Sequence, residues 1–105
     1  MKKELYLKCY LGRLKRMSKE VIFVASSTPV KSLASSITRM LDEGKDIELR
    51  GIGAGANSQA IKAVASARVF VNKQGKELLI RPCFDTIINK DGEERTVCVF
   101  NLLVW

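Results

Sequence analysis

The spacing of hydrophobic positions in the first half of the chain predicts a strand followed by a helix. Residues 20–25, EVIFVA, form a short β-branched run that is typical of a buried strand. Residues 30–41 then place apolar side chains at helical spacing. The predicted apolar face consists of Val30, Leu33, Ala34, Ile37, Met40 and Leu41. Thr28 is the predicted N-cap, Pro29 suits the first helical turn, and Gly44 is placed to end the helix.

A second strand and a second helix follow the same logic. The segment DIELRGIG, residues 46–53, alternates Ile47 and Leu49 with polar residues and reads as a strand. Residues 54–70 return to helical spacing. The inward face of this predicted helix consists of Ala56, Ala60, Ala63, Val64 and Ala67. Because these side chains are small, the helix can lie close to a sheet or to a partner helix.

The last third of the chain has the pattern of a long β-hairpin. Two strands, at about residues 77–88 and 94–104, flank the turn NKDGEE, and Asp91-Gly92 is a strong hairpin signal. Pro82 cannot donate a hydrogen bond to a neighbouring strand, so the first of these strands is predicted to be an edge strand or to carry a bulge.

The predicted element order is β-α-β-α-β-β. Right-handed crossovers between parallel strands place both helices on one face of a mixed four-stranded sheet. The fold class is therefore α/β, more narrowly an α+β two-layer sandwich, and the length of 105 residues fits one domain.

The net charge of +7 is distributed unevenly. Residues 1–16 hold six basic residues against one acidic residue, so the remaining residues, 17–105, are only mildly basic. We expect residues 1–16 to be a basic N-terminal extension and residues 17–105 to be the domain. The extension has the pattern of a basic amphipathic helix that could touch a membrane surface or nucleic acid. Alternatively, Met17 is the true start and the extension is flexible or mis-annotated.

Composition argues against several classes of protein. The chain contains no histidine and no paired-carboxylate motif, so we expect no enzyme activity, no catalytic residues, no metal site and no cofactor. Its cysteines, Cys9, Cys83 and Cys98, fit small buried hydrophobic residues in a reducing cytoplasm better than a disulfide framework. Neither a membrane-spanning run nor a signal peptide is expected.

The glycine-rich segment GIGAGA, residues 51–56, nearly satisfies the dinucleotide-binding fingerprint. A dinucleotide fold, however, carries that fingerprint after its first strand and an acidic residue at the end of the next parallel strand. Here the glycines follow the second strand, and Glu77 begins a hairpin strand. The glycines are explained by tight turns and close packing. Their polar neighbours at the start of the second helix, with Arg50 before them, suit a phosphodiester backbone instead.

Three segments, VASSTPVKSLASSI, GIGAGANSQAIKAVASAR and DGEERT, resemble the stage V sporulation protein S family over about residues 19–100. That family is similar in fold to Alba, the archaeal chromatin protein. The resemblance implies a cytoplasmic nucleic-acid-binding protein, a homodimer or higher homo-oligomer, with a regulatory part in bacterial sporulation or development.

By position, the resemblance implies contacts to DNA or RNA from the first loop, the start of the second helix and the hairpin. Arg50, at the end of the second strand, is added to the residues that the resemblance implies. The complete set of predicted contact residues is Ser26, Ser27, Lys31, Arg50, Gly53, Asn57, Gln59, Lys62, Lys90 and Arg95. The hairpin tip is acidic, with Asp91, Glu93 and Glu94, which opposes insertion along a phosphate groove and favours weak to moderate binding.

An alternative function is protein–protein assembly in a developmental programme without nucleic acid. Two observations favour it: the nearly balanced charge of residues 17–105, and the apolar last strand, VCVFNLLVW. An exposed strand of that kind tends to pair with another chain.

Overall fold

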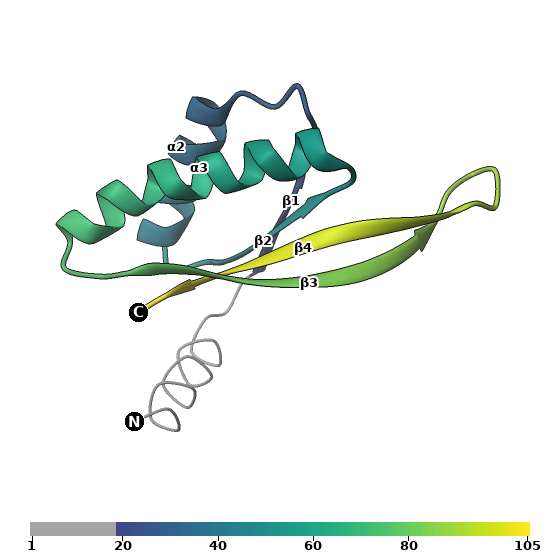
Figure 1. Ribbon diagram of the computed structural model, residues 1–105. Helices are drawn as coiled ribbons and strands as arrows, with labels where there is room; N and C mark the ends of the chain where they lie inside the picture. The colour runs from purple at the N-terminus through teal and green to yellow at the C-terminus, as the bar shows by residue number, and fades with distance from the viewer. Residues whose placement is uncertain (1–18) are drawn as a thin grey trace.

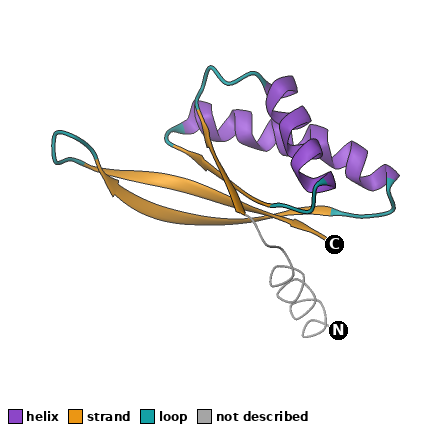
Figure 2. Ribbon diagram, turned by 180° about the vertical axis from the view of Figure 1, so that it is seen from behind, coloured by secondary structure: helices purple, strands orange, loops and turns teal. Residues whose placement is uncertain are grey.

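The computed structural model describes residues 19–105, which form two helices packed on one four-stranded sheet (Figure 1). The elements are β1 (Lys19–Val24), α2 (Val30–Asp42), β2 (Asp46–Gly51), α3 (Ala54–Lys73), β3 (Leu78–Ile88) and β4 (Glu94–Val104). Both helices lie on the same face of the sheet, as the view from behind also shows (Figure 2). The predicted order and the two-layer architecture are therefore confirmed.

The strands lie in the order β1-β2-β4-β3. β1 and β2 are parallel, whereas β4 pairs antiparallel with β2 on one side and with β3 on the other. β3 is thus an edge strand, as Pro82 predicted. The last strand does not lie at an edge of the sheet, because β4 lies between β2 and β3, which use both of its edges over residues 98–102. This position weakens one of the two observations that favour an assembly function, and it leaves the other, the nearly balanced charge of residues 17–105, unchanged.

Helix α2 buries the face that the sequence predicts. Leu33, Ala34 and Ile37 are buried, and the other three apolar residues of the face pack against the same core. At its end, Gly44 has φ +77°, and the Lys45 N–H donates to the Met40 carbonyl, which closes the last turn in the manner of a Schellman motif.

The N-cap of α2 differs from the prediction. Pro29 is the cap residue, in extended conformation, and no side chain caps the helix. Thr28 stands one residue too early for that role. Its hydroxyl accepts a hydrogen bond from the Ala25 N–H at 2.8 Å, while its own N–H donates to the Ala25 carbonyl at 3.0 Å. Thr28 therefore closes the loop after β1 and leaves the first turn of α2 without a side-chain acceptor.

Helix α3 lies close to the sheet because its inner face is made of small residues. All five predicted inward residues are buried, and Val71 extends the same face by one turn. The helix runs three residues beyond the predicted end, to Lys73. The core between the layers is completed by Leu49, Phe100 and Leu102 from the sheet. No helix within residues 19–105 is long and apolar enough to cross a membrane.

The β3–β4 hairpin is longer than the sheet that supports it. β2 ends at Gly51, which pairs with Cys98, so residues 85–88 and 94–97 pair only with each other. They form a two-stranded arm that extends past the start of α3 (Figure 1). Its turn is closed by the Asn89 N–H donating to the Glu93 carbonyl, with Gly92 at φ +78°. The predicted hairpin is confirmed.

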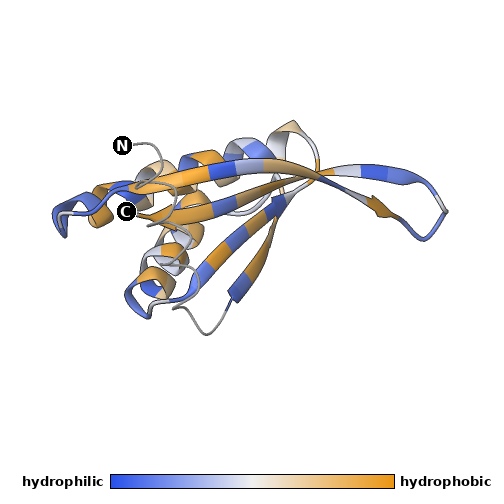
Figure 3. Ribbon diagram, turned by 90° about the horizontal axis from the view of Figure 1, so that it is seen from below, coloured by the Kyte–Doolittle hydropathy of each residue, from blue (hydrophilic) through white to orange (hydrophobic). Residues whose placement is uncertain are grey.

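The face of the sheet away from the helices, which Figure 3 views from below, carries both polar and apolar side chains. By strand alternation, Glu48 and Arg50 share it with Val21, Phe23 and Val99. No element within residues 19–105 covers it. Cys83 lies on this face at the exposed edge strand, so the prediction that it is buried is wrong. Cys98, on the helix side, is half-buried, and Cys9 lies outside the described residues.

An ion pair joins the far end of α3 to the start of β3. Arg68 donates to both carboxylate oxygens of Glu77, and this bonding lowers the pKa of Glu77 to about 2. The charged form of Glu77 stabilises the fold above its unfolded pKa of about 4.5, and this contribution is lost as pH falls toward 2. We expect Glu77→Gln to flatten the fall in the free energy of unfolding between these pH values, as urea titrations at several pH values would measure. An equally steep fall in the variant would contradict this role.

Candidate nucleic-acid interface

The loop after β1 and the start of α3 lie against each other. Gly55, in the first turn of α3, approaches Ser26 so closely that a Cβ on Gly55 would lie 2.8 Å from the Ser26 Cβ. One turn further along, the Gln59 side-chain amide donates to the Thr28 carbonyl at 2.8 Å. Two segments of the predicted site, joined by a hydrogen bond between residues 31 apart in sequence, are therefore adjacent in space.

The start of α3 is open to an incoming anion. Gly53 caps the helix with φ +89°, a conformation that favours glycine, and the first turn contains no acidic residue. The first N–H groups of a helix have no partner within the helix and carry partial positive charge. Ser26, Ser27 and Gly53 are all exposed beside this end of the helix.

Asn57 and Gln59 have structural partners. The Asn57 amide donates to the Cys98 sulfur at 3.1 Å, which ties the second turn of α3 to β4. Its Oδ1 atom is buried and accepts no hydrogen bond within residues 19–105. The Gln59 amide is held by the loop, as described above. The side chains of Asn57 and Gln59 therefore hold the loop and the helix in position, and contacts with a ligand fall to the exposed residues beside them.

Two exposed lysines supply positive charge at this end of the molecule. Lys31 is exposed in the first turn of α2, and Lys62 is exposed in the third turn of α3. The first turn of α2, like that of α3, has no acidic residue. Within the described part of the chain, neither lysine forms an ion pair, so both charges are available to a polyanion.

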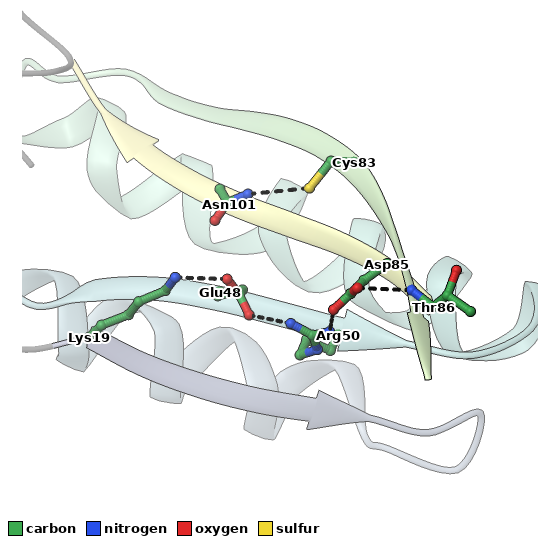
Figure 4. Close-up of polar contacts among 7 residues, drawn as sticks. All are labelled: Lys19, Glu48, Arg50, Cys83, Asp85, Thr86 and Asn101. Carbon is green, nitrogen blue, oxygen red and sulfur yellow. Dashed lines mark hydrogen bonds and ion pairs between the residues drawn. The ribbon is translucent and has the colours of Figure 1, made fainter. Parts of the chain in front are cut away.

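Arg50 does not join this cluster, contrary to the expectation. Strand alternation turns Arg50 away from the buried Leu49, onto the face without helices. There its guanidinium donates to Glu48 and to Asp85, while Lys19 pairs with Glu48 from the other side at 2.8 Å (Figure 4). Local sequence patterns do not predict this pairing, because Asp85 lies 35 residues from Arg50 in sequence.

The pKa values of this network show that its charges satisfy one another. The hydrogen bond from Lys19, with help from Arg50, lowers the pKa of Glu48, and the hydrogen bond from Arg50 lowers that of Asp85. The two carboxylates in turn raise the pKa of Arg50. The network crosses the sheet from β1 to β3 and holds β3 in place, so Arg50 is a structural residue in this conformation.

Lys90 and Arg95 lie in the arm, away from Lys31 and Lys62. Lys90 is in the turn, and Arg95 pairs with Ile87 near the tip. The arm starts beside α3 and runs outward (Figure 1). Lys90 and Arg95 can therefore contact a ligand bound at the start of α3 only if that ligand is long enough to extend along the arm.

Sequence reasoning missed the role of Gly55. Tight turns and close packing explain the glycines of this segment as a group, but the pattern does not show that Gly55 is the one that lets the loop touch the helix. Only the pairing of the two segments in space identifies it. A glycine inside a helical pattern was the available signal, because glycine disfavours helix unless something requires it.

The comparison with protein families identifies the family of the chain. The family model described as stage V sporulation protein S (SpoVS) matches residues 20–104, which is nearly all of the described chain. The chain belongs to the stage V sporulation protein S family. The SpoVS match ends at Val104 and so includes the hairpin arm as well as both helices.

A solved structure shows the fold of this SpoVS chain in another protein. Alba from Thermoplasma volcanium superimposes with a TM-score of 0.57, covering 80% of this chain and 99% of the Alba chain at 16% sequence identity. The fold is therefore Alba-like. At this identity the likeness concerns the fold and leaves the binding residues to be argued from the SpoVS chain itself.

Proposed function

We propose that this SpoVS-family protein binds the phosphate backbone of a nucleic acid at the end of the sheet where the β1 loop meets α3. The contact between Ser26 and Gly55 carries the proposal, because it joins two helix starts without acidic residues and two unpaired lysines into one surface. Ser26, Ser27 and Gly53 would supply backbone and hydroxyl donors, and Lys31 and Lys62 the charge.

The proposed biological role is regulation of sporulation or development, which the family suggests. The proposed assembly is a homodimer or a higher homo-oligomer. A second copy would double the number of cations that face one nucleic acid, since a single protomer offers few. The binding unit is proposed to be residues 17–105, and residues 1–16, outside the described part, would add nonspecific attraction only.

A salt titration of binding tests the site. We expect the double variant Lys31→Ala/Lys62→Ala to bind duplex DNA about tenfold more weakly at low salt and to lower the slope of log affinity against log salt by about 1.8, because each neutralised phosphate contributes about 0.9. Fluorescence anisotropy with a labelled duplex measures both quantities. The double variant Lys73→Ala/Lys76→Ala is the control, because it removes the same charge at the opposite end of α3.

Equal slopes for the wild-type protein and the Lys31/Lys62 variant would overturn the proposed site. Absence of binding to DNA and RNA at low salt would overturn the function. Deleting residues 1–16 separates the contribution of the domain from that of the extension. If residues 17–105 still bind and the Lys31/Lys62 variant still weakens that binding, the domain is the binding unit. If binding disappears with residues 1–16, the domain is not the binding unit.

A further inference from the structure

An exposed aromatic ring lies beside the proposed backbone-binding surface. Phe84, on β3, has 77% of its surface exposed, which is unusual for a large apolar side chain in the sheet of a small domain. Such a residue costs solvation free energy in the free protein and indicates a surface that a ligand can cover. Phe23 on β1 is equally exposed, at 78%, but lies on the face without helices.

The register of the sheet places Phe84 next to the start of α3. Gly51, Cys98 and Phe84 form one row across three strands. The Cys98 sulfur accepts the hydrogen bond from Asn57 of α3, so this row faces the helices. Side chains of directly paired residues on one sheet face lie about 5 Å apart at Cβ. The ring of Phe84 therefore flanks the second turn of α3, at the point where the arm leaves the sheet.

The charges of the arm determine which part of a nucleic acid can contact the ring of Phe84. The turn beyond Phe84 carries Asp91, Glu93 and Glu94 against two cations, so it repels the phosphates that line both grooves of a duplex. An uncharged base has no such conflict. Base faces stack on aromatic side chains whatever their sequence, provided that the base is not already stacked inside a helix.

We propose that Phe84 is a stacking platform for an unpaired base, so that the surface prefers single-stranded RNA or DNA to a duplex. The proposal rests on the proposed function and deepens it: the phosphates of the strand lie along Lys31 and Lys62, and one base turns onto the ring at the root of the arm. Ile88, 71% exposed and further along the same side of β3, offers an apolar continuation for the next base.

The test compares one substitution on two ligands, with the full-length chain. Labelled oligonucleotides of about 12 nucleotides are used, single-stranded and as a duplex, because single-strand site sizes run from about 4 to 16 nucleotides. We expect Phe84→Ala to weaken single-strand binding roughly tenfold, since stacking on one ring is worth about that factor or more, and to leave duplex binding within about twofold. Phe84→Tyr should retain single-strand affinity. Phe23→Ala, the matched control, should change neither affinity.

A second readout reports the stack itself. In Phe84→Trp, tryptophan fluorescence should be quenched by the single strand and not by the duplex, with the emission of Trp105 in the wild-type protein as the background. Equal losses on both ligands, or no loss on either, would overturn the stacking role while leaving the backbone site intact. If sedimentation shows that Phe84→Ala changes the mass of the oligomer while the affinity for the single strand is unchanged, then Phe84 contacts another protein chain, and the proposal is overturned. No binding of either ligand by the wild-type protein would instead remove the proposed function.

Discussion

Truncation of Ile37 to alanine is expected to lower the free energy of unfolding by about 3–4 kcal/mol, the largest effect of any single substitution considered for this fold. Ile37 lies at the centre of α2 with no exposed surface, between the helix and the sheet. Its removal leaves a cavity that the close-packed alanines of α3 cannot fill. For a domain of this size the loss corresponds to a fall in melting temperature of roughly 12–32 °C. Urea titration followed by circular dichroism measures the first quantity and a thermal scan the second.

A graded series provides the control for this prediction. Ile37→Val removes one methyl group and should cost about 0.5–1.5 kcal/mol. Ser35→Ala, at an exposed position two residues earlier, should stay within about 0.5 kcal/mol. If Ile37→Ala costs no more than Ser35→Ala, then α2 does not pack on the sheet as described.

The substitution Gly55→Ala is expected to cost about 2 kcal/mol although alanine is the better helix former. Intrinsic propensity alone would favour alanine by about 1 kcal/mol. The added Cβ, however, would lie 2.8 Å from the Ser26 Cβ, and that atom is fixed to the loop backbone, so the loop and the helix must separate. Because the same contact builds the proposed backbone-binding surface, nucleic-acid affinity should fall together with stability. Urea titration and anisotropy on the same variant measure the two effects.

Compensation at the other side of the contact makes the test specific. Ser26→Gly removes the atom against which the new Cβ would collide. The double variant Ser26→Gly/Gly55→Ala should therefore recover most of the lost stability, with a coupling free energy of about 1–2 kcal/mol between the two sites. Ser58→Ala, on the exposed side of α3, serves as a neutral control. Additive losses in the double variant would show that the loop and α3 are not in contact.

Elements with strong periodicity could be predicted from sequence. The apolar faces of α2 and α3 were identified residue by residue, since helical spacing specifies which side chains point inward. The hairpin turn and the edge position of β3 followed from Asp91-Gly92 and from Pro82. In each case, local backbone preference and burial favour the same structure.

Features that depend on tertiary contacts could not be predicted in this way. Arg50 looked like a free cation, because nothing nearby in sequence shows that Asp85 will be brought over from β3 to meet it. Thr28 has the chemistry of an N-cap, but an extended Pro29 displaced the helix start by one residue. The hydrophobicity of the last strand could not show whether it pairs with another chain, because hydrophobicity alone does not distinguish a buried central strand from an unprotected one.

The interior position of β4 also affects how the protein is made. When a nascent chain has emerged from the ribosome only as far as β3, β1 and β2 can pair with each other, but β3 has no partner strand. The strand that pairs with both β2 and β3, β4, is still missing. β4 forms the local hairpin with β3, and it also pairs with β2, which lies about 50 residues earlier in the sequence. We therefore expect the sheet to form late during synthesis, in one cooperative step after β4 has emerged, rather than strand by strand as the ribosome delivers it.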